Sequence, residues 1–179
     1  MLKTIALVVL AVIAAFLGYV ALQPAVGAVV RSAVIAAPAD RIFPHVNTLK
    51  KWDDWSPWAK LDPNAKTEFE GPDSGVGAIF KWAGNDEIGQ GAMAIVESTP
   101  SERLKIRLDF AKPFSSTSDV LFTFVPEGEG TRVTWSMTGE RPFLTRAMCI
   151  LFNADKMVGD MYEKGLANLA KFATAPPPA

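Results

Sequence analysis

The sequence predicts an α+β domain, in which an antiparallel sheet is followed by a long C-terminal helix, behind one N-terminal transmembrane helix. Three observations predict this class. Residues 5–22 are apolar and carry no charge. Beyond Trp58, apolar and polar residues alternate with a period of two, as in strands that bury one face. From Phe143 onward the period becomes helical, with the apolar residues on one broad side.

The N-terminal apolar run is long enough to cross a bilayer. As a helix it would span roughly 27 Å, close to the thickness of the hydrocarbon core. Lys3 precedes the run and the next charge is Arg31, so the positive-inside tendency places the domain outside the cytoplasm. A cleavable signal peptide is the rival interpretation, because Val26-Gly27-Ala28 resembles a cleavage site. The apolar length favours an uncleaved, single-pass anchor in the cell membrane, residues 1–27, with a periplasmic or otherwise extracytoplasmic domain.

The soluble part begins close to this anchor, because only a short connection follows the apolar run. Residues 29–36 have an apolar, β-rich composition and predict a strand. Pro38 suits the first turn of a helix, and Asp40 is favourable near the positive end of that helix. The buried stripe of this helix is predicted at Ile42, Phe43 and Val46.

Three of the five tryptophans of the chain, Trp52, Trp55 and Trp58, lie within seven residues. Each ring buries on the order of 150–250 Å² and keeps one N–H at its edge. The run predicts one or two short helical turns, which Pro57 limits. Two roles remain open: the rings complete the core at one end of the sheet, or one or two of them line a cavity and contact a ligand.

The strand region has the pattern of a meander. Between residues 103 and 110 every second residue is apolar, and charged residues lie between them. The same alternation recurs around Trp82, Phe122 and Trp135, and residues 89–99 have the length of a long strand. Turn-forming clusters separate these runs. Such short connections predict about six antiparallel strands, since parallel strands need longer crossovers.

The C-terminal segment predicts a long helix, with Gly159 and Gly165 on its apolar side. Glycine in a helix interior costs about 1 kcal/mol relative to alanine. Each glycine therefore needs a reason, such as a close approach to the sheet or a bend. The proline-rich residues 174–179 cannot continue a helix and are predicted to be disordered, which leaves residues 28–173 as the domain.

Composition argues against several classes of function. The 18 basic and 19 acidic residues give a net charge of −1, with no basic stripe to neutralise phosphates, so we expect no nucleic-acid partner. Cys149 is the single cysteine and His45 the single histidine, so no Cys/His cluster has the spacing of a zinc site. We expect no metal and no cofactor.

Several segments resemble one known family. The runs WSPWAKLDP, EGPDSGVGAIFKWAGN, LDFAKPF, GTRVTWSMTG and DKMVGDMYEKGLANL are similar to the polyketide cyclase/dehydrase-type branch of the SRPBCC, or START-like, superfamily. The resemblance covers residues 31–172, and the predicted order of elements is that of the helix-grip (START/Bet v 1-like) fold. It implies a curved antiparallel sheet that wraps the long helix around an apolar cavity. Members of the superfamily include lipid-transfer proteins, small-molecule binders, aromatase/cyclases and co-chaperone domains.

In a fold of this kind, core and cavity wall are the same surface, so the large apolar side chains are also the candidate ligand contacts. No catalytic residue is predicted. His45 has no Ser, Cys or carboxylate at a recognisable motif distance, and Asp53 and Asp54 would point about 100° apart on a helix. The candidate cavity-lining residues are Phe43, Trp52, Trp55, Trp58, Phe80, Trp82, Met93, Phe110, Phe122, Trp135, Val158, Met161 and Tyr162.

The leading functional hypothesis is a membrane-anchored START-like domain that binds a hydrophobic small molecule or lipid without catalysis. Two alternatives stay open. A cyclase or dehydratase would need polar groups that converge inside the cavity. A protein-interaction domain would have a collapsed cavity, and its outer sheet face or residues 143–152 would contact a protein or the bilayer. The sequence does not indicate an oligomeric state.

Overall fold

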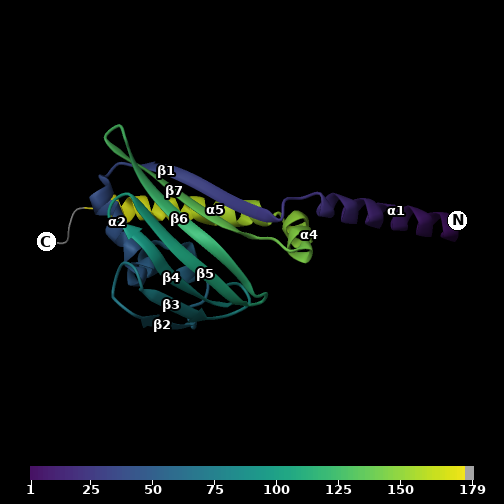
Figure 1. Ribbon diagram of the computed structural model, residues 1–179, viewed down its shortest axis with the longest axis horizontal. Coiled ribbons are helices and arrows are strands. Elements are labelled where there is room, and N and C mark those ends of the chain that lie inside the picture. The colour runs from purple at the N-terminus through teal and green to yellow at the C-terminus, as the bar shows by residue number, and fades with distance from the viewer. Residues whose placement is uncertain (176–179) are drawn as a thin grey trace.

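The computed structural model describes residues 1–175, so the predicted disordered tail lies outside the described residues from 176 onward, and Thr174 still belongs to the last helix. Figure 1 shows one projecting helix followed by a sheet packed against several helices. The elements in chain order are α1 (Leu2–Ala21), β1 (Val26–Ile35), α2 (Ala39–Asn47), η1 (Leu49–Lys51), α3 (Trp52–Trp55), η2 (Pro57–Lys60), β2 (Lys66–Glu70), β3 (Ile79–Ala83), β4 (Gln90–Thr99), β5 (Arg103–Lys112), β6 (Ser116–Glu127), β7 (Gly130–Glu140), α4 (Phe143–Phe152) and α5 (Ala154–Thr174).

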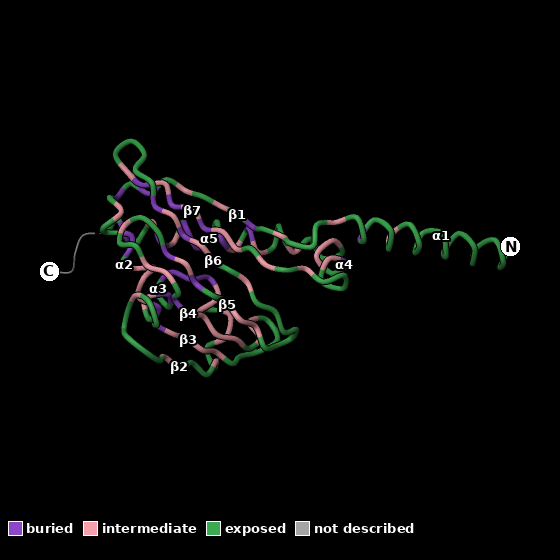
Figure 2. Tube along the Cα trace, viewed as in Figure 1, coloured by how far each residue is buried: buried purple, intermediate pink, exposed green. Residues whose placement is uncertain are grey.

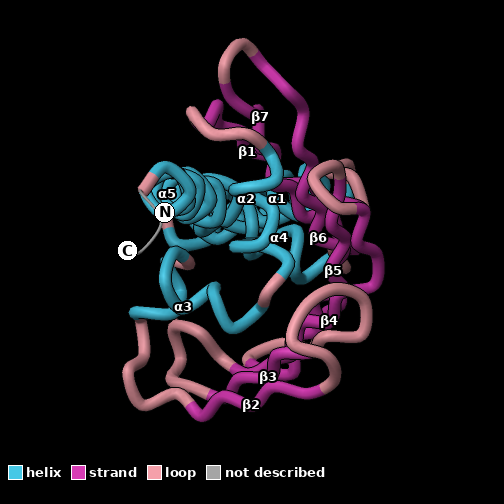
Figure 3. Tube along the Cα trace, turned by 90° about the vertical axis from the view of Figure 1, so that its left-hand side faces the viewer, coloured by secondary structure: helices cyan, strands magenta, loops and turns pink. Residues whose placement is uncertain are grey.

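The seven strands form one antiparallel sheet in the order β1-β7-β6-β5-β4-β3-β2. The predicted six-stranded meander is confirmed as β2 to β7, and β1 completes the sheet beside β7. The register between β6 and β7 pairs Phe122 with Trp135 and Val120 with Met137. These large side chains therefore share the concave face, on which the helices lie (Figure 3). The arrangement is the helix-grip fold.

The helix α2 begins after Pro38 and buries the three predicted residues Ile42, Phe43 and Val46. Its N-terminal end is tied to the sheet by the buried hydroxyl of Thr131 on β7, which donates to the carbonyl oxygen of Ala37 at 2.8 Å. The purple segments of Figure 2 mark the buried backbone where α2, α3 and α5 meet the middle of the sheet.

One helix does not run through the C-terminal segment, contrary to the helical period that begins at Phe143. Asn153 has φ +48° and ψ +49°, and this left-handed conformation separates α4 from α5. Asparagine tolerates that region better than most residues. As a result α5 packs against the sheet, whereas α4 turns aside and contacts α1.

The N-terminal helix α1 is long and apolar enough to span a bilayer, with a mean hydropathy of 2.6 over its most apolar window. It projects from the end of the domain where α4 lies (Figures 1 and 2). Nearly all of its side chains are exposed, and Val20 in the last turn is buried. Only residues 22–25 separate α1 from β1.

Candidate functional site

The tryptophan run is bound to the end of α2 by its indole N–H groups. Trp52 Nε1 donates to the carbonyl oxygen of Val46 at 2.9 Å, and Trp55 Nε1 donates to the carbonyl oxygen of His45 at 3.0 Å. These carbonyls lie in the last turn of α2, where a helix has no internal donors left for its oxygens. The sequence therefore places the polar edge of each ring where it satisfies the helix terminus.

The same rings fill the middle of the concave face. Trp52 and Trp55 have ring centroids 4.7 Å apart, and Trp55 meets Trp135 edge to face at 5.5 Å. Phe122 lies 4.8 Å from Trp135, and Tyr162 of α5 stacks on Trp135 at 4.0 Å. All five side chains are buried. The tryptophan run is thus part of the core, with half-buried Trp58 at its rim.

Two titratable groups in this region have shifted pKa values. Burial raises the pKa of the Tyr162 hydroxyl above its usual ~10, so the phenol stays protonated at neutral pH. Burial, and secondarily the positive charge of Lys51, lower the pKa of His45. Within the described residues, Nδ1 of His45 has no hydrogen-bond partner. Burial therefore disfavours the charged form of both Tyr162 and His45.

A second aromatic row continues the concave face toward β2. Phe69 lies 5.0 Å from Phe80, which stacks on Trp82 at 5.9 Å, and Trp82 meets Phe110 edge to face at 5.6 Å. Met93 is aligned with Phe80 and packs on the same face. These side chains are only partly buried. The part of the concave face beside β2 to β5 is therefore more exposed than the part covered by the tryptophans.

A hollow of about 970 Å³, the α4 hollow, lies between α4 and the strand ends of β5, β6 and β7. Its walls come mainly from the β5–β6 hairpin with the adjoining strand ends, the end of β7, and α4 with the start of α5, and Val26 of β1 completes the lining. It is lined by Val26, Phe110, residues 113–119, residues 138–140, Pro142, Leu144, Thr145, Met148, Cys149, Phe152, Ala154 and Met157.

The lining of the α4 hollow is mainly apolar, with large side chains from Phe110, Phe114, Leu144, Phe152 and Met157. Serine and threonine hydroxyls of the β5–β6 hairpin and β6 add a few neutral donors and acceptors. Apolar walls with a small number of placed polar groups are typical of sites for hydrophobic small molecules.

Charged chemistry is limited in the α4 hollow. Two carboxylates, Asp119 and Glu140, belong to its lining. Asp119 is engaged by Lys105, whose Nζ lies 2.9 Å from Oδ2, and Glu140 is exposed. Among residues 1–175, no three His, Cys, Asp or Glu side chains are grouped closely enough to hold a metal ion. The arrangement can enclose an apolar group and hydrogen-bond one polar end of it.

A smaller hollow of about 660 Å³, the outer hollow, crosses β2 to β5. Lys81 and Asp109 both align with Ala92, so the three share the face opposite the aromatic row. Gly91 and Ala92 also line it, together with Trp82 and Phe110. Its mixed charges and open shape resemble ordinary solvated sheet surface.

The predicted cavity residues fall into two groups. Phe110 lines both hollows and Trp82 lines the outer one. The others line neither hollow and pack in or against the core, except Met161, a half-buried residue of α5. This second group is Phe43, Trp52, Trp55, Trp58, Phe80, Met93, Phe122, Trp135, Val158, Met161 and Tyr162.

Sequence reasoning missed the residues that α4 and the β5–β6 hairpin contribute to the larger hollow, such as Phe114, Leu144 and Phe152. The available signal is the α4 sequence FLTRAMCILF, which carries one charge in ten residues. From the sequence, that segment is expected only as an outer contact surface. Its role as a wall depends on the turn at Asn153, which the apolar period does not reveal.

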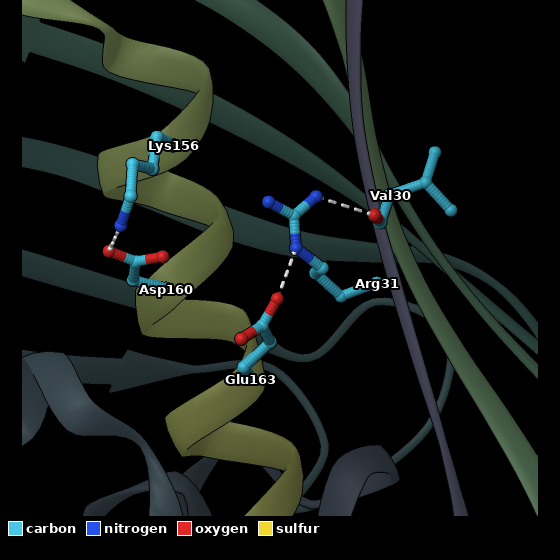
Figure 4. A network of polar contacts seen from close by, with 5 residues as sticks. All are labelled: Val30, Arg31, Lys156, Asp160 and Glu163. Atoms are coloured by element: carbon cyan, nitrogen blue, oxygen red, sulfur yellow. Dashed lines mark hydrogen bonds and ion pairs between the residues drawn. The ribbon is translucent and has the colours of Figure 1, made fainter.

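Polar contacts fix α5 to the edge strand β1 of the sheet. Arg31 of β1 donates from Nε to Glu163 Oε1 at 2.6 Å and from Nη1 to the carbonyl oxygen of Val30 at 2.9 Å (Figure 4). A Cβ on Gly159 would lie 2.0 Å from Nη2 of Arg31. The glycine thus makes room for the guanidinium, which confirms a close approach at this position.

The fold is shared with solved structures at low sequence identity. Protein MLL2253 from Mesorhizobium loti is 19% identical, with 82% of this chain and 96% of that chain covered and a TM-score of 0.60. TTHA0849 from Thermus thermophilus is 18% identical, with 82% and 97% covered and a TM-score of 0.59. CalU16 from Micromonospora echinospora is 19% identical, with 85% and 80% covered and a TM-score of 0.55. No curated protein sequence matches the chain significantly.

The family model described as polyketide cyclase / dehydrase and lipid transport matches residues 27–173, from the first strand to the last helix. The matched residues include the sheet, α5, the tryptophan run and all but one of the residues that line the α4 hollow. The match agrees with the architecture described above. The chain therefore belongs to the polyketide cyclase/dehydrase and lipid transport family of the SRPBCC, or START-like, superfamily.

Proposed function

We propose that this protein is a membrane-anchored START-like domain that binds a hydrophobic small molecule or a lipid in the α4 hollow, without catalysis. The observation that carries the proposal is the position of that hollow. A mainly apolar space of about 970 Å³ lies at the end of the domain from which α1 projects. The volume is within the ~300–1,000 Å³ range of small-molecule sites.

The chemistry of the lining supports binding of an apolar ligand. Phe110, Phe114 and Met157 offer only dispersion and hydrophobic contacts, which favour an alkyl or aromatic group. Hydroxyls of Ser116 and Ser118 lie on the same wall and can hydrogen-bond a hydroxyl, carbonyl or phosphate oxygen of the ligand. Such a pattern suits an amphipathic molecule.

The test is binding of a fluorescent apolar probe, 1-anilinonaphthalene-8-sulfonate, to the full chain in detergent, together with native mass spectrometry for co-purified lipid. Ser116→Trp places a bulky ring inside the α4 hollow at a strand position that is exposed. Ser32→Trp, at an exposed position of β1 outside the hollow, is the matched control.

We expect Ser116→Trp to weaken probe binding by about tenfold, equivalent to ~1.4 kcal/mol, and Ser32→Trp to leave it unchanged. Equal affinity in the two variants, with no lipid in the mass spectrum of the wild-type chain, would overturn binding in this hollow. Anchoring is tested separately, by whether the full chain partitions with phosphatidylcholine vesicles and resists extraction at alkaline pH.

A further inference from the structure

The last turn of α1 is held against α4 by polar and apolar contacts. Arg146 of α4 donates from Nη1 to the carbonyl oxygen of Gln23 at 2.7 Å and to that of Ala21 at 3.3 Å. Carbonyls at a helix C-terminus lack internal donors and attract cations. Val20 of α1 is completely buried beside α4, and Ala147 is the buried residue of α4. The position of α1 therefore fixes the position of α4.

The remaining surface of α4 is unusually apolar for an exposed helix. Leu144 is 65% exposed and Phe152 is 65% exposed, and Arg146 is the single charged residue of the helix. An exposed apolar face of this size marks a contact surface. Its large exposed side chains are Phe143, Leu144, Met148, Leu151 and Phe152.

The exposed apolar surface extends beyond α4 across the α4 hollow. Phe114, between β5 and β6, is 63% exposed, and Met157 in the first turns of α5 is also exposed. Both residues line the α4 hollow together with Leu144 and Phe152. The rim of the hollow is thus itself apolar, on the α4 side as well as on the hairpin side.

The geometry of α1 decides what can cover this rim. Its 20 residues span about 30 Å at 1.5 Å per residue, the thickness of the hydrocarbon core. When α1 crosses a bilayer, its last turn lies at the boundary between hydrocarbon and headgroups. Because Arg146 and Val20 join that turn to α4, the exposed face of α4 comes to the same boundary. Large apolar side chains on a helix are stabilised there.

We propose that α4 and the β5–β6 hairpin dock on the bilayer surface, so that the α4 hollow opens into the lipid rather than into water. This inference rests on the anchoring in the proposed function. It adds what covers the apolar rim of the hollow, namely the interfacial region of the bilayer that α1 spans. A bound lipid then enters sideways, with its chains toward the apolar rim and its polar end toward the hydroxyls of β6.

The experiment measures the depth of nitroxide labels on the full chain in phosphatidylcholine vesicles with a minority of phosphatidylglycerol. The background is Cys149→Ser, and single labels are introduced through Phe114→Cys, Leu144→Cys and Phe152→Cys. Val12→Cys reports whether α1 is in the membrane. Val76→Cys, exposed in the connection between β2 and β3 that contacts Asn47 of α2, is the matched aqueous control. Collision with oxygen and with a water-soluble nickel chelate gives the depth of each label.

We expect labels at 114, 144 and 152 to collide with oxygen several-fold more, relative to the nickel chelate, than the label at 76. If the label at 12 is deep while these three behave as the label at 76 does, docking is overturned and anchoring stands. An aqueous label at 12 overturns both. Labels at 144 and 152 that are shielded from both reagents and show dipolar broadening overturn bilayer docking in favour of a second copy.

Discussion

A Cβ built on Gly165 of α5 would lie 2.8 Å from Cζ3 of Trp135, closer than side-chain carbons pack, and 3.2 Å from Cδ of Pro57. The helix therefore reaches the sheet at this point only because residue 165 has no side chain. The space that a side chain would occupy is filled by the Trp135 ring and by Pro57.

The first prediction concerns this contact. Gly165→Ala gains about 1 kcal/mol of helix propensity, but its methyl group must displace the Trp135 ring, which is 2% exposed and enclosed by other rings. Overpacking of a core typically costs about 1–3 kcal/mol, so we expect a net loss of stability. Denaturant unfolding of the full chain in detergent, followed by near-UV circular dichroism, measures the change.

Gly159→Ala is the matched control in the same helix. The atoms nearest to its Cβ belong to the end of the Arg31 side chain, which is partly exposed and can rotate away. The salt bridge to Glu163 that this movement breaks contributes little at such an exposure. Gly159→Ala should therefore be less destabilising than Gly165→Ala, and the reverse order would contradict the close-packing argument.

The second prediction concerns Trp55, which is fully buried among Trp52, Phe122 and Trp135. Trp55→Ala should lower the free energy of unfolding by about 3–5 kcal/mol, the usual cost of removing a buried aromatic ring. Trp55→Phe keeps a ring but leaves the carbonyl oxygen of His45 without its donor, so a smaller loss of about 1–3 kcal/mol is expected.

Half-buried Trp58 is the comparison for Trp55, and Trp58→Ala should be less destabilising than Trp55→Ala. Chemical denaturation of the three variants ranks them. A Trp55→Ala chain with wild-type stability and no probe binding would assign the tryptophan to ligand contact instead of the core.

The third prediction is a pH dependence of stability. Because the folded-state pKa of His45 is lowered by burial, the unfolded chain, with a histidine pKa of ~6.5, takes up a proton more readily. The contribution of His45 is therefore fully present above pH ~6.5 and declines as the pH falls toward the folded-state value. Thermal unfolding of wild type and His45→Gln between neutral and mildly acidic pH measures this component. If both chains lose stability in parallel across that window, His45 is not responsible.

The fourth prediction concerns the contact between α1 and α4. Arg146→Met keeps much of the length of the side chain but removes the donors to the carbonyl oxygens of Ala21 and Gln23. We expect several-fold faster amide hydrogen exchange in the connection at residues 22–25, measured by mass spectrometry. Lys156→Met, which removes an exposed positive charge from α5, should leave this exchange unchanged. Unchanged exchange in Arg146→Met would show that other contacts hold α1.

Local patterns predicted most of the fold because they report which face of an element is buried. Alternation between residues 103 and 110 identified β5, and the stripe of Ile42, Phe43 and Val46 identified α2. The turn at Asn153 was missed because apolar residues continue at helical spacing on both sides of it, and asparagine also occurs inside helices. One residue in a left-handed conformation changes the direction of the chain without changing that pattern.

The candidate site was less predictable, since its walls come from segments far apart in the sequence. Phe114 and Phe152 line the same hollow but are separated by β6 and β7. Most of the predicted aromatic residues pack on the concave face, yet the tryptophans there contact one another more than they enclose space. Side chains fill the concave face where α5 lies close to the sheet. The contact between Gly165 of α5 and Trp135 of β7 sets that distance.

The connection at residues 22–25 has a consequence for transport. Four residues reach at most about 14 Å when fully extended, so a domain attached to a membrane by α1 could not cross to a facing membrane with a cargo. Its exchange of ligands would be confined to one plane, where donors and acceptors arrive by lateral diffusion. Such a protein would act as a local reservoir or a presenting site within its own membrane, and its occupancy would follow the composition of the leaflet around it.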